Sequence, residues 1–263
     1  MRRRTKGLLL AIFLVLPIAY IWRLPKIPHM PITISSNSDF SEQGWVGNGT
    51  LEDPYVLSGI SIVSNTACVS IADTDVYFVI RDCYFSTFST SECAIVMDSV
   101  FNGMIDQCEI TGSGGGVRLD SSRYCIVSNM TINVSMDPIC GFIGGDHLFI
   151  QNHIRGGRSL IFSTIVDCVF VGNTVIGAVN GLALVMSSYG WSVTENSFEN
   201  CEERILISYG SIIPDHPSVV FSNNFVTGTS DDAIRVYLTN AVIHNNTITN
   251  NDGDAIKAEV SYR

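Results

Sequence analysis

The sequence predicts an all-β fold, a right-handed parallel β-helix of about nine to ten coils, preceded by an N-terminal hydrophobic helix. A short pattern recurs at intervals of 21–27 residues, which is the sign of a solenoid. The expected strands are short, rich in Val, Ile and Phe, and separated by Gly, Asn, Asp and Ser. Charged residues make up only 15% of the chain, which argues against a coiled coil or an ion-paired helical bundle, and 46% hydrophobic residues exclude a disordered chain.

Residues 1–24 have the pattern of a signal peptide or a signal-anchor transmembrane helix. Basic residues at 2–6 are followed by an uncharged apolar run over residues 7–22. This run is shorter than the ~20 residues that a permanent membrane span prefers. Bulky residues at 20–22 leave no clear cleavage site and suit a membrane interface. We expect a single-pass anchor in the cell membrane with an extracellular body, and a cleaved signal with a secreted body is the alternative.

The charge distribution separates the N-terminus from the rest of the chain. Six of the 15 basic residues and none of the 25 acidic residues lie within residues 1–26, so the remainder carries a net charge of −16. An acidic body repels phosphate backbones, which argues against nucleic-acid binding. Cations, or ligands that tolerate negative surroundings, are the expected partners.

A six-residue pattern defines residues 57–263 as the repeat domain and leaves residues 25–56 as a linker and N-terminal cap. Each copy reads as an apolar residue, two variable residues, a small, sulfur-containing or amide residue, one variable residue and a second apolar residue. The fourth residues of the copies lie at 60, 83, 108, 130, 152, 173, 196, 223 and 246. Leucine-rich repeats have a similar period, but they need regularly spaced Leu and usually a helix in each unit, and neither is visible.

Two or three short strands per repeat would stack coil on coil, about 4.8 Å apart, each coil bonding only to its neighbours. The fourth position is Asn in the later repeats, at 152, 173, 196, 223 and 246, and Cys83, Cys108 or Met130 in earlier ones. Stacked amides at a turn bond along a ladder and tolerate left-handed backbone. We interpret this column of Asn as structural.

The segment before the first repeat carries a family resemblance. It reads Gly47-Asn48-Gly49-Thr50, then Pro54-Tyr55 and Gly59-Ile60. This segment is similar to the lead-in of NosD-like proteins, also called carbohydrate-binding and sugar-hydrolase (CASH) domains, and the resemblance extends over residues 32–263. It implies an exported β-helix. Members include sugar-acting enzymes, factors linked to the maturation of copper sites and surface proteins of unassigned role, so the resemblance alone implies no single activity.

The eight cysteines form no C-x-x-C pair, so the usual zinc and thioredoxin spacings are absent. Cys83 and Cys108 share a position in adjacent coils, and Cys68 and Cys93 both lie fifteen residues before those positions. Adjacent coils bring equivalent Cα atoms within the range that a disulfide requires. Both pairs are disulfide candidates in an exported chain, and a ladder of reduced thiols is the alternative.

Asp73, Asp98 and Asp120 each lie ten residues before a central position, where a strand gives way to a turn. Three carboxylates on successive coils would repel one another unless they are hydrated or bridged by a cation. Oxygen ligands favour Ca²⁺, so this alignment is a candidate calcium site. Asp is also a common turn residue, and turn formation is the competing interpretation.

The feature most typical of an enzyme lies near the C-terminus. Asp231, Asp232 and Arg235 are followed 22 residues later by Asp254 and a lysine. These two segments resemble the segments that carry Asp and Arg or Lys in polygalacturonase-type β-helix enzymes, in which paired carboxylates cleave glycosides. The Asn-Thr-Asp, Gly-His-Gly and Arg-Ile-Lys segments of those hydrolases are absent. These four residues are therefore catalytic candidates only.

Surface features complete the set of expectations. Sequons at Asn48, Asn129, Asn133 and Asn245 are glycosylation candidates, with Asn48 the most accessible and the others in ladders. Aromatic platforms for a sugar are expected at Tyr189 and Trp191, or at Tyr209 and Tyr237. The sequence stops a few residues into a tenth coil, and an open parallel edge predicts end-to-end self-association.

Taken together, these features predict an exported, membrane-tethered β-helix that binds a saccharide or a cell-surface protein without catalysis. A polysaccharide lyase or glycoside hydrolase is the first alternative. A NosD-like accessory factor in metal-site assembly is the second. No cofactor other than Ca²⁺ is indicated.

Overall fold

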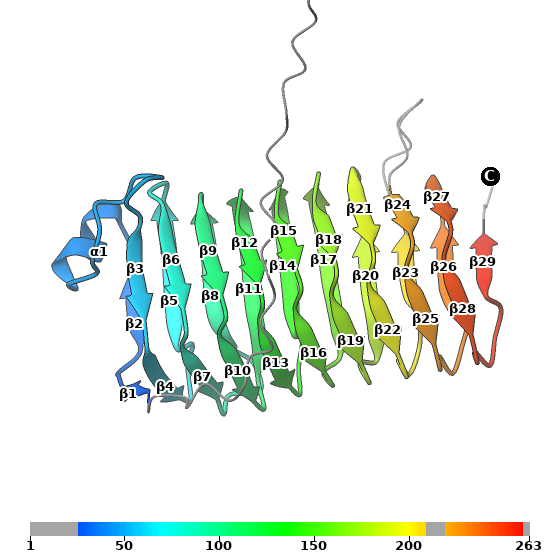
Figure 1. Ribbon diagram of the computed structural model, residues 1–263, viewed down its shortest axis with the longest axis horizontal. Helices are drawn as coiled ribbons and strands as arrows, with labels where there is room; N and C mark the ends of the chain where they lie inside the picture. The colour runs from blue at the N-terminus through cyan, green and yellow to red at the C-terminus, as the bar shows by residue number, and fades with distance from the viewer. Residues whose placement is uncertain (1–25, 209–218, 260–263) are drawn as a thin grey trace, which may run out of the picture.

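The chain winds into a parallel β-helix in the computed structural model, which describes residues 26–208 and 219–259. Three sheets run along the rod, and the chain visits each of them once per coil (Figure 1). Within the described residues, two sheets have ten strands and the third has nine. The predicted solenoid is confirmed. The predicted N-terminal hydrophobic helix falls on residues 1–25, which lie outside the described residues.

We name the three sheets A, B and C. Sheet A consists of β1 (Ile27–Pro28), β4 (Ile60–Ser64), β7 (Tyr84–Thr87), β10 (Glu109–Gly112), β13 (Thr131–Val134), β16 (His153–Arg155), β19 (Thr174–Ile176), β22 (Ser197–Glu199), β25 (Phe225–Thr227) and β28 (Thr247–Thr249). Sheet B consists of β2 (Ile32–Ile34), β5 (Val69–Thr74), β8 (Cys93–Val100), β11 (Gly115–Arg123), β14 (Ile139–Gly145), β17 (Ser159–Val166), β20 (Asn180–Val185), β23 (Ile205–Ser208), β26 (Ile234–Tyr237) and β29 (Ile256–Glu259). Sheet C consists of β3 (Tyr55–Ser58), β6 (Phe78–Arg81), β9 (Gly103–Asp106), β12 (Ile126–Ser128), β15 (Leu148–Ile150), β18 (Val169–Val171), β21 (Trp191–Thr194), β24 (Val219–Ser222) and β27 (Ala241–His244).

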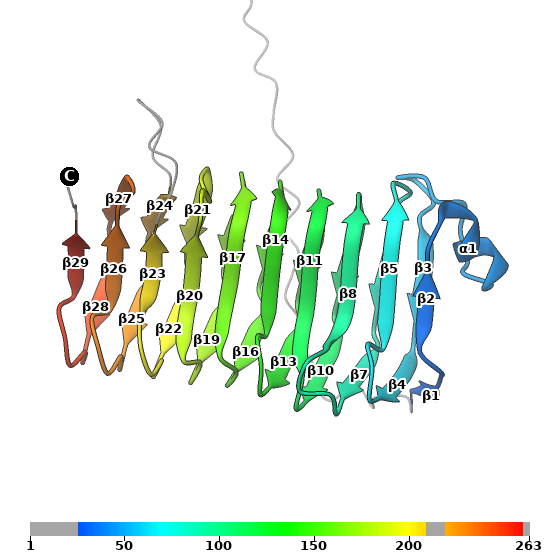
Figure 2. The same ribbon diagram turned by 180° about the vertical axis from the view of Figure 1, so that it is seen from behind.

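Strand pairing in all three sheets is parallel, and equivalent residues of successive coils lie side by side. In sheet C, for example, Ile80 pairs with Ile105, which pairs in turn with Val127. Figure 2 shows the long strands of sheet B side by side, each running across the long axis of the rod. Alternate side chains of each strand point into the rod, where Val, Ile, Leu and Phe form one continuous core. Every outward position therefore belongs to a straight column that runs parallel to the rod axis.

A short helix and an aromatic cluster cover the N-terminal end of this core. Helix α1 (Asn37–Glu42) buries Phe40 completely, and the Phe40 ring stacks on Tyr55 with centroids 5.1 Å apart and meets Trp45 edge-on at 5.0 Å. Gly47 adopts φ +122° with the Pro54 carbonyl oxygen 2.1 Å from where a Cβ would lie, so only glycine fits there. The described residues before β3, 26–54, cover this end of the core and also supply β1 and β2.

The column of buried Asn residues confirms the structural interpretation with one correction. The ladder consists of Asn152, Asn173, Asn196, Asn224 and Asn246, because each side-chain oxygen accepts the N–H of the preceding ladder residue. The sequence pattern placed Asn223 in this column, but Asn223 is exposed and adopts φ +56°. The strand register pairs Val193 with Phe221 and not with Val220, so every position of this copy shifts by one and the ladder residue is Asn224.

Among the described residues, we find no helix of the length and apolarity needed to cross a membrane. The expected anchor at residues 7–22 lies outside this part of the chain.

Candidate binding groove

A groove on the outer face of sheet C is floored by one column of apolar side chains. Val79, Met104, Ile126 and Leu148 occupy equivalent outward positions of β6, β9, β12 and β15, and the strand register pairs each with the next. All four are half-buried and line a cavity of about 450 Å³. Three steps of about 4.8 Å make this floor roughly 14 Å long. The same column continues as Val56 before the floor and Val169 after it, so it is apolar in six successive coils.

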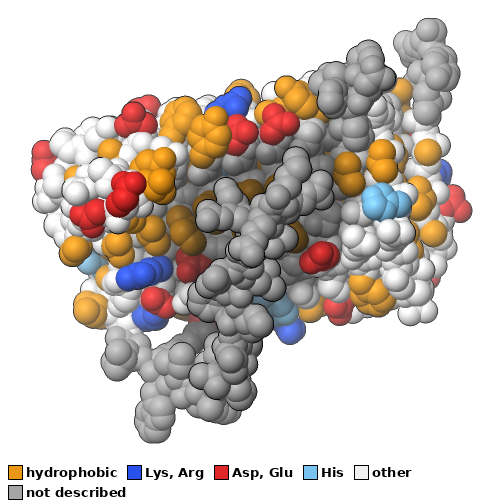
Figure 3. All heavy atoms as spheres, turned by 45° about the horizontal axis from the view of Figure 1, so that its top comes forward, with side chains coloured by type: hydrophobic (Ala, Val, Ile, Leu, Met, Phe, Trp, Pro, Cys, Tyr) orange, Lys and Arg blue, Asp and Glu red, His pale blue; other side chains and the backbone are white. Residues whose placement is uncertain are grey.

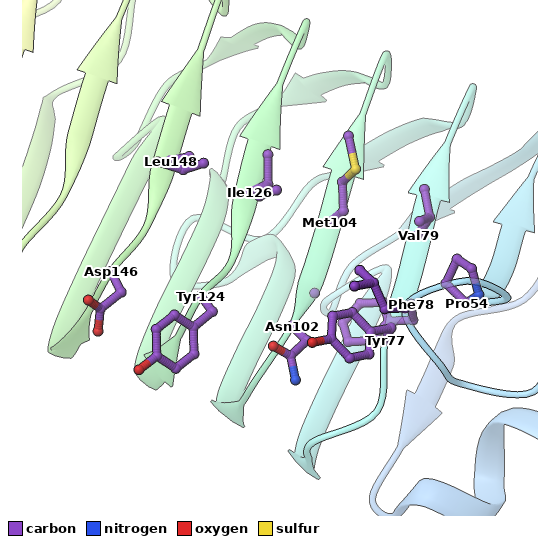
Figure 4. Close-up of a pocket in the computed structure, with 12 residues that line it drawn as sticks. Pro54, Tyr77, Phe78, Val79, Asn102, Met104, Tyr124, Ile126, Asp146 and Leu148 are labelled. Carbon is purple, nitrogen blue, oxygen red and sulfur yellow. The ribbon is translucent and has the colours of Figure 1, made fainter. Parts of the chain in front are cut away.

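One wall of the groove comes from the turn that precedes each sheet C strand. Tyr77, Asn102, Tyr124 and Asp146 lie in register, two residues before the floor column, and all four line the cavity. Figure 4 shows this row of polar-tipped side chains beside the aliphatic floor. Leu51 and Pro54, from the segment before β3, close the N-terminal end. The result is an apolar trough with hydroxyl, amide and carboxylate groups along one edge.

The wall is built from residues with left-handed backbone. Asn102, Tyr124 and Asp146 have φ values of +62°, +57° and +56°. Asn and Asp tolerate this region well, but a tyrosine there costs about 1 kcal/mol relative to glycine. The ring of Tyr124 is 52% exposed, so burial in the core does not offset that cost. The same φ recurs at Asp167 in the next coil, so the turn of the solenoid dictates this conformation.

The electrostatics of the groove are close to neutral. Asp146 is the one carboxylate among the lining residues, and its Oδ2 lies 2.7 Å from Nη1 of Arg123. Asn102 donates from Nδ2 to the backbone carbonyl of Asp75 at 2.9 Å, which fixes its amide and leaves Oδ1 as the acceptor of that side chain. The groove therefore offers hydrogen bonds without a net local charge.

Further apolar side chains extend this face beyond the groove. Phe101 lies beside Tyr124, with ring centroids 6.5 Å apart, and is 37% exposed. Phe142 and Ile143, within β14 of the neighbouring sheet B, are 42% and 62% exposed. Figure 3 shows hydrophobic side chains scattered over the N-terminal half of the rod on the face turned toward the viewer.

Sequence reasoning missed the groove. Its floor residues fall on positions that the repeat pattern treats as variable, and its wall residues belong to turns. The available indication was the residue directly before the first apolar residue of each repeat, which is Val, Met, Ile and Leu in four consecutive coils.

The aromatic residues expected to form sugar platforms lie elsewhere. Trp191 is 1% exposed and donates its indole N–H to the Ile165 carbonyl at 2.9 Å, so it is a core residue and not a platform. Tyr189 and Tyr237 are half-buried, and Tyr209 lies outside the described residues. The tyrosines that line the groove, Tyr77 and Tyr124, were not singled out from the sequence.

The cysteine candidates divide into one aligned pair and one misaligned pair. Cys83 and Cys108 are neighbours in adjacent coils, with the Cys83 N–H 3.4 Å from the Cys108 sulfur. Cys68 instead donates its N–H to the Ala94 carbonyl at 2.8 Å, so it lies one residue out of register with Cys93. Burial raises the pKa of the Cys68 thiol to about 11. All eight cysteines are free thiols in the structure, and the Cys83–Cys108 disulfide stays a prediction.

The three aspartates of the candidate calcium site do not form one stack. Asp98 pairs with Asp120, but the partner of Asp98 on the other side is Ala72, so Asp73 is displaced by one residue. Asp120 is already bound by Arg118, whose Nη2 lies 2.6 Å from Oδ2. Among the described residues, no group of three or more His, Cys, Asp or Glu side chains is placed to hold a metal ion. The register removes the geometric basis for the calcium site.

The C-terminal charged cluster forms ion pairs that link adjacent coils. Asp232 is 4% exposed; its Oδ2 lies 2.7 Å from Nη2 of Arg235, and its Oδ1 accepts the Asp254 N–H at 3.1 Å. Asp231 pairs with Arg204, while Asp254 is exposed. Burial raises the pKa of Asp232, but the Asp254 N–H and the Arg235 guanidinium outweigh it and hold that pKa below its usual range. An ionised carboxylate with both oxygens engaged lacks the proton of a general acid.

The four sequon asparagines are all exposed. Asn48 lies in the cap, where its Oδ1 accepts the Thr50 hydroxyl at 2.9 Å. Asn129, Asn133 and Asn245 were expected to be hidden in ladders, but each lies at an outward or turn position. The structure thus leaves every candidate glycosylation site accessible.

Comparison with solved structures places the fold among known β-helices. PfbA, a surface adhesin of Streptococcus pneumoniae, is similar with a TM-score of 0.54 and 12% identity over 89% of this chain and 76% of that chain. The A-module of the mannuronan C-5 epimerase AlgE6 of Azotobacter vinelandii has a TM-score of 0.46 and 14% identity over 88% of this chain and 69% of its own. The catalytic domain of a GH87 α-1,3-glucanase has a TM-score of 0.44 and 10% identity, over 79% of this chain and 54% of its own. Identities this low show the fold alone.

No curated protein sequence matches this chain. A family does match: the right handed beta helix region aligns with residues 93–237 and, in a second overlapping match, with residues 142–262. The first match alone covers more than half of the chain, and the two together extend over residues 93–262. The protein therefore belongs to the right-handed β-helix family.

Proposed function

We propose that this protein is a non-catalytic β-helix that binds a saccharide in the groove over β6, β9, β12 and β15. The observation that carries the proposal is the pairing of an aliphatic floor with a wall of aromatic and amide side chains. Binding pockets combine apolar surface with a few placed polar groups in this way.

Saccharides suit such a groove because each sugar ring has an apolar C–H face and a rim of hydroxyls. Tyrosine offers a rigid ring for the face and a hydroxyl for the rim. Tyr124 is half-exposed at the wall, and the Oδ1 of Asn102 beside it is free to accept a hydroxyl hydrogen. The acidic body, with a net charge of −16 outside residues 1–26, favours an uncharged ligand over an anionic one.

The groove geometry supports binding rather than hydrolysis. Glycoside cleavage commonly uses two carboxyl groups about 5–10 Å apart, one of them protonated. Asp146 is a single carboxylate among the lining residues, and Arg123 pairs with it. The carboxylates of the C-terminal cluster lie on the coils of β26 and β29, far along the rod from β6–β15 (Figure 1).

We further propose that the β-helix works outside the cell, tethered by residues 7–22 or released after cleavage. The support is the basic segment followed by an uncharged apolar run in the sequence. A surface location would present the groove to polysaccharides of the environment or of neighbouring cells.

The floor of the groove provides the direct test. Replacing Ile126 with Asn removes apolar contact at the centre of the floor, and we expect about a tenfold loss of affinity, equivalent to about 1.4 kcal/mol. Ile176→Asn is the matched control, because Ile176 is also half-buried and outward-facing but lies on sheet A. Binding would be measured by calorimetry with ligands identified on a glycan panel. Equal losses in both variants, or no glycan bound by the unmodified protein, would contradict the proposal.

A further inference from the structure

The two tyrosines of the groove wall are separated by a fixed number of coils. Tyr77, Asn102 and Tyr124 occupy the same position of three consecutive coils, so the tyrosine backbones are two steps apart, which is about 10 Å. Strand pairing holds this spacing: Val79 pairs with Met104, which pairs with Ile126, and Asn102 donates its N–H to the Arg123 carbonyl at 3.4 Å. Strand pairing therefore fixes the distance between successive residues of the wall.

From this spacing we propose that the ligand is an extended, uncharged β-1,4-linked saccharide that lies parallel to the rod axis. The inference rests on the proposed function of the groove. In an extended β-1,4-linked chain, alternate sugar rings are turned by half a rotation, and equivalent ring faces recur at every second sugar. That disaccharide repeat is close to the two-coil distance between Tyr77 and Tyr124. An α-1,4-linked glucan such as maltotetraose curves and does not follow a straight column of this kind.

The remaining groups of the groove fit the same placement. Asn102, midway between the two tyrosines, presents its Oδ1 to the hydroxyl rim of the intervening sugar, while its Nδ2 stays bound to the Asp75 carbonyl. The aliphatic column of Val79, Met104, Ile126 and Leu148 runs beside the wall along the same axis. Figure 4 shows the wall and the floor as two parallel rows. A straight ligand contacts both rows over their whole length.

Ligand length separates this proposal from simple stacking on a tyrosine. Cellotetraose spans both platforms, so Tyr77→Ala and Tyr124→Ala should each weaken its binding about tenfold. Cellobiose occupies one platform at a time, so either substitution should lower its affinity by no more than about twofold, which is the loss of one of two equivalent sites. The double variant should lose both ligands. Phe88→Ala is the control, because Phe88 is 64% exposed and lies beyond the end of β7 on sheet A.

Calorimetric titration of the full chain with cellobiose, cellotetraose and maltotetraose measures these effects. Cellotetraose binding at least tenfold tighter than maltotetraose supports the proposal. Equal affinity for the two tetrasaccharides, with Ile126→Asn still weakening both, would overturn the linkage assignment and keep the groove as a saccharide site. Equal effects of the tyrosine substitutions on cellobiose and cellotetraose would overturn the two-platform arrangement. If none of the three ligands binds, the β-1,4 assignment fails, and so does the groove as a binding site for these sugars.

Discussion

At the scale of single residues, His147 is a titratable group placed inside the core. It lies between Cys125 and Cys168 in one column, and its Nδ1 accepts the Cys125 N–H at 3.2 Å. The proton of the neutral ring is therefore on Nε2, which has no hydrogen-bond partner within the described part of the chain. Burial, together with the nearby charge of Arg123, lowers the pKa of His147 to about 4.

This depressed pKa predicts a loss of stability in mild acid. The unfolded chain takes up a proton at the ordinary histidine pKa of about 6.5, but the folded chain does so only near 4. Neutral His147 therefore contributes about 3 kcal/mol to the free energy of unfolding above pH 6.5, and this contribution is lost as the pH falls to 4. His147→Asn keeps an acceptor for the Cys125 N–H and should remove this slope from urea-unfolding free energies. His244→Asn, at an exposed histidine, should leave the slope intact, and a slope that survives in His147→Asn would contradict the assignment.

The sequence could not reveal this environment. His147 precedes a strand and is flanked by acidic Asp146, which is the pattern of an ordinary turn. Its burial follows from the register that stacks it on two cysteines, and that register becomes visible only when the coils are aligned residue by residue.

At the scale of an element, the Asn ladder joins the turns between sheets C and A. The Asn224 amide donates to the Val193 carbonyl at 2.9 Å and to Oδ1 of Asn246 at 3.0 Å, and its own Oδ1 accepts the Asn196 N–H at 2.9 Å. Asn224→Leu leaves these buried groups unpaired. The expected cost is about 3 kcal/mol, because each unsatisfied group costs about 1–3 kcal/mol.

The neighbouring residue supplies the matched control for the ladder. Asn223 is exposed at φ +56°, a conformation that glycine adopts freely, so Asn223→Gly should change the free energy of unfolding by less than about 0.5 kcal/mol. Hydrogen exchange of the amides of β22, β24 and β25 reports the local effect. If Asn223→Gly loses more protection than Asn224→Leu, then Asn223 is the ladder residue, as the sequence pattern suggested.

Two misassigned positions, Asn223 in the ladder and Asp73 in the aspartate column, show the limit of what the sequence pattern predicts. The pattern predicted the ladder, its amide chemistry and most of its members. It failed at an Asn-Asn pair because either residue satisfies the pattern, and at Asp73 because one turn is longer by a residue. Turn lengths vary without changing the strands, so errors of one residue arise at turns and pass into every pairing inferred across them.

At the scale of the whole molecule, the rod was predictable and the groove was not. The repeat period dictates a solenoid, because each coil can bury its apolar face only against its neighbours. The groove depends on side chains that point away from the core, where the repeat imposes no residue type. Its four apolar floor positions and two tyrosines become a surface only once the coils are stacked in register.

The final prediction concerns the end of the rod. Phe40 is completely buried against Tyr55, Trp45 and Phe78, so Phe40→Ala opens the cap at a cost of about 3–5 kcal/mol. Because coils interact only with their neighbours, hydrogen exchange should accelerate in β2–β6 and stay unchanged in β24–β29. The exposed parallel edge should also promote self-association on size-exclusion chromatography. Val63→Ala, at a residue 55% exposed on β4, is the control. Equal acceleration along the whole rod would mean that the solenoid unfolds as one cooperative unit, and the groove at its N-terminal half would then be no easier to open than the C-terminal coils.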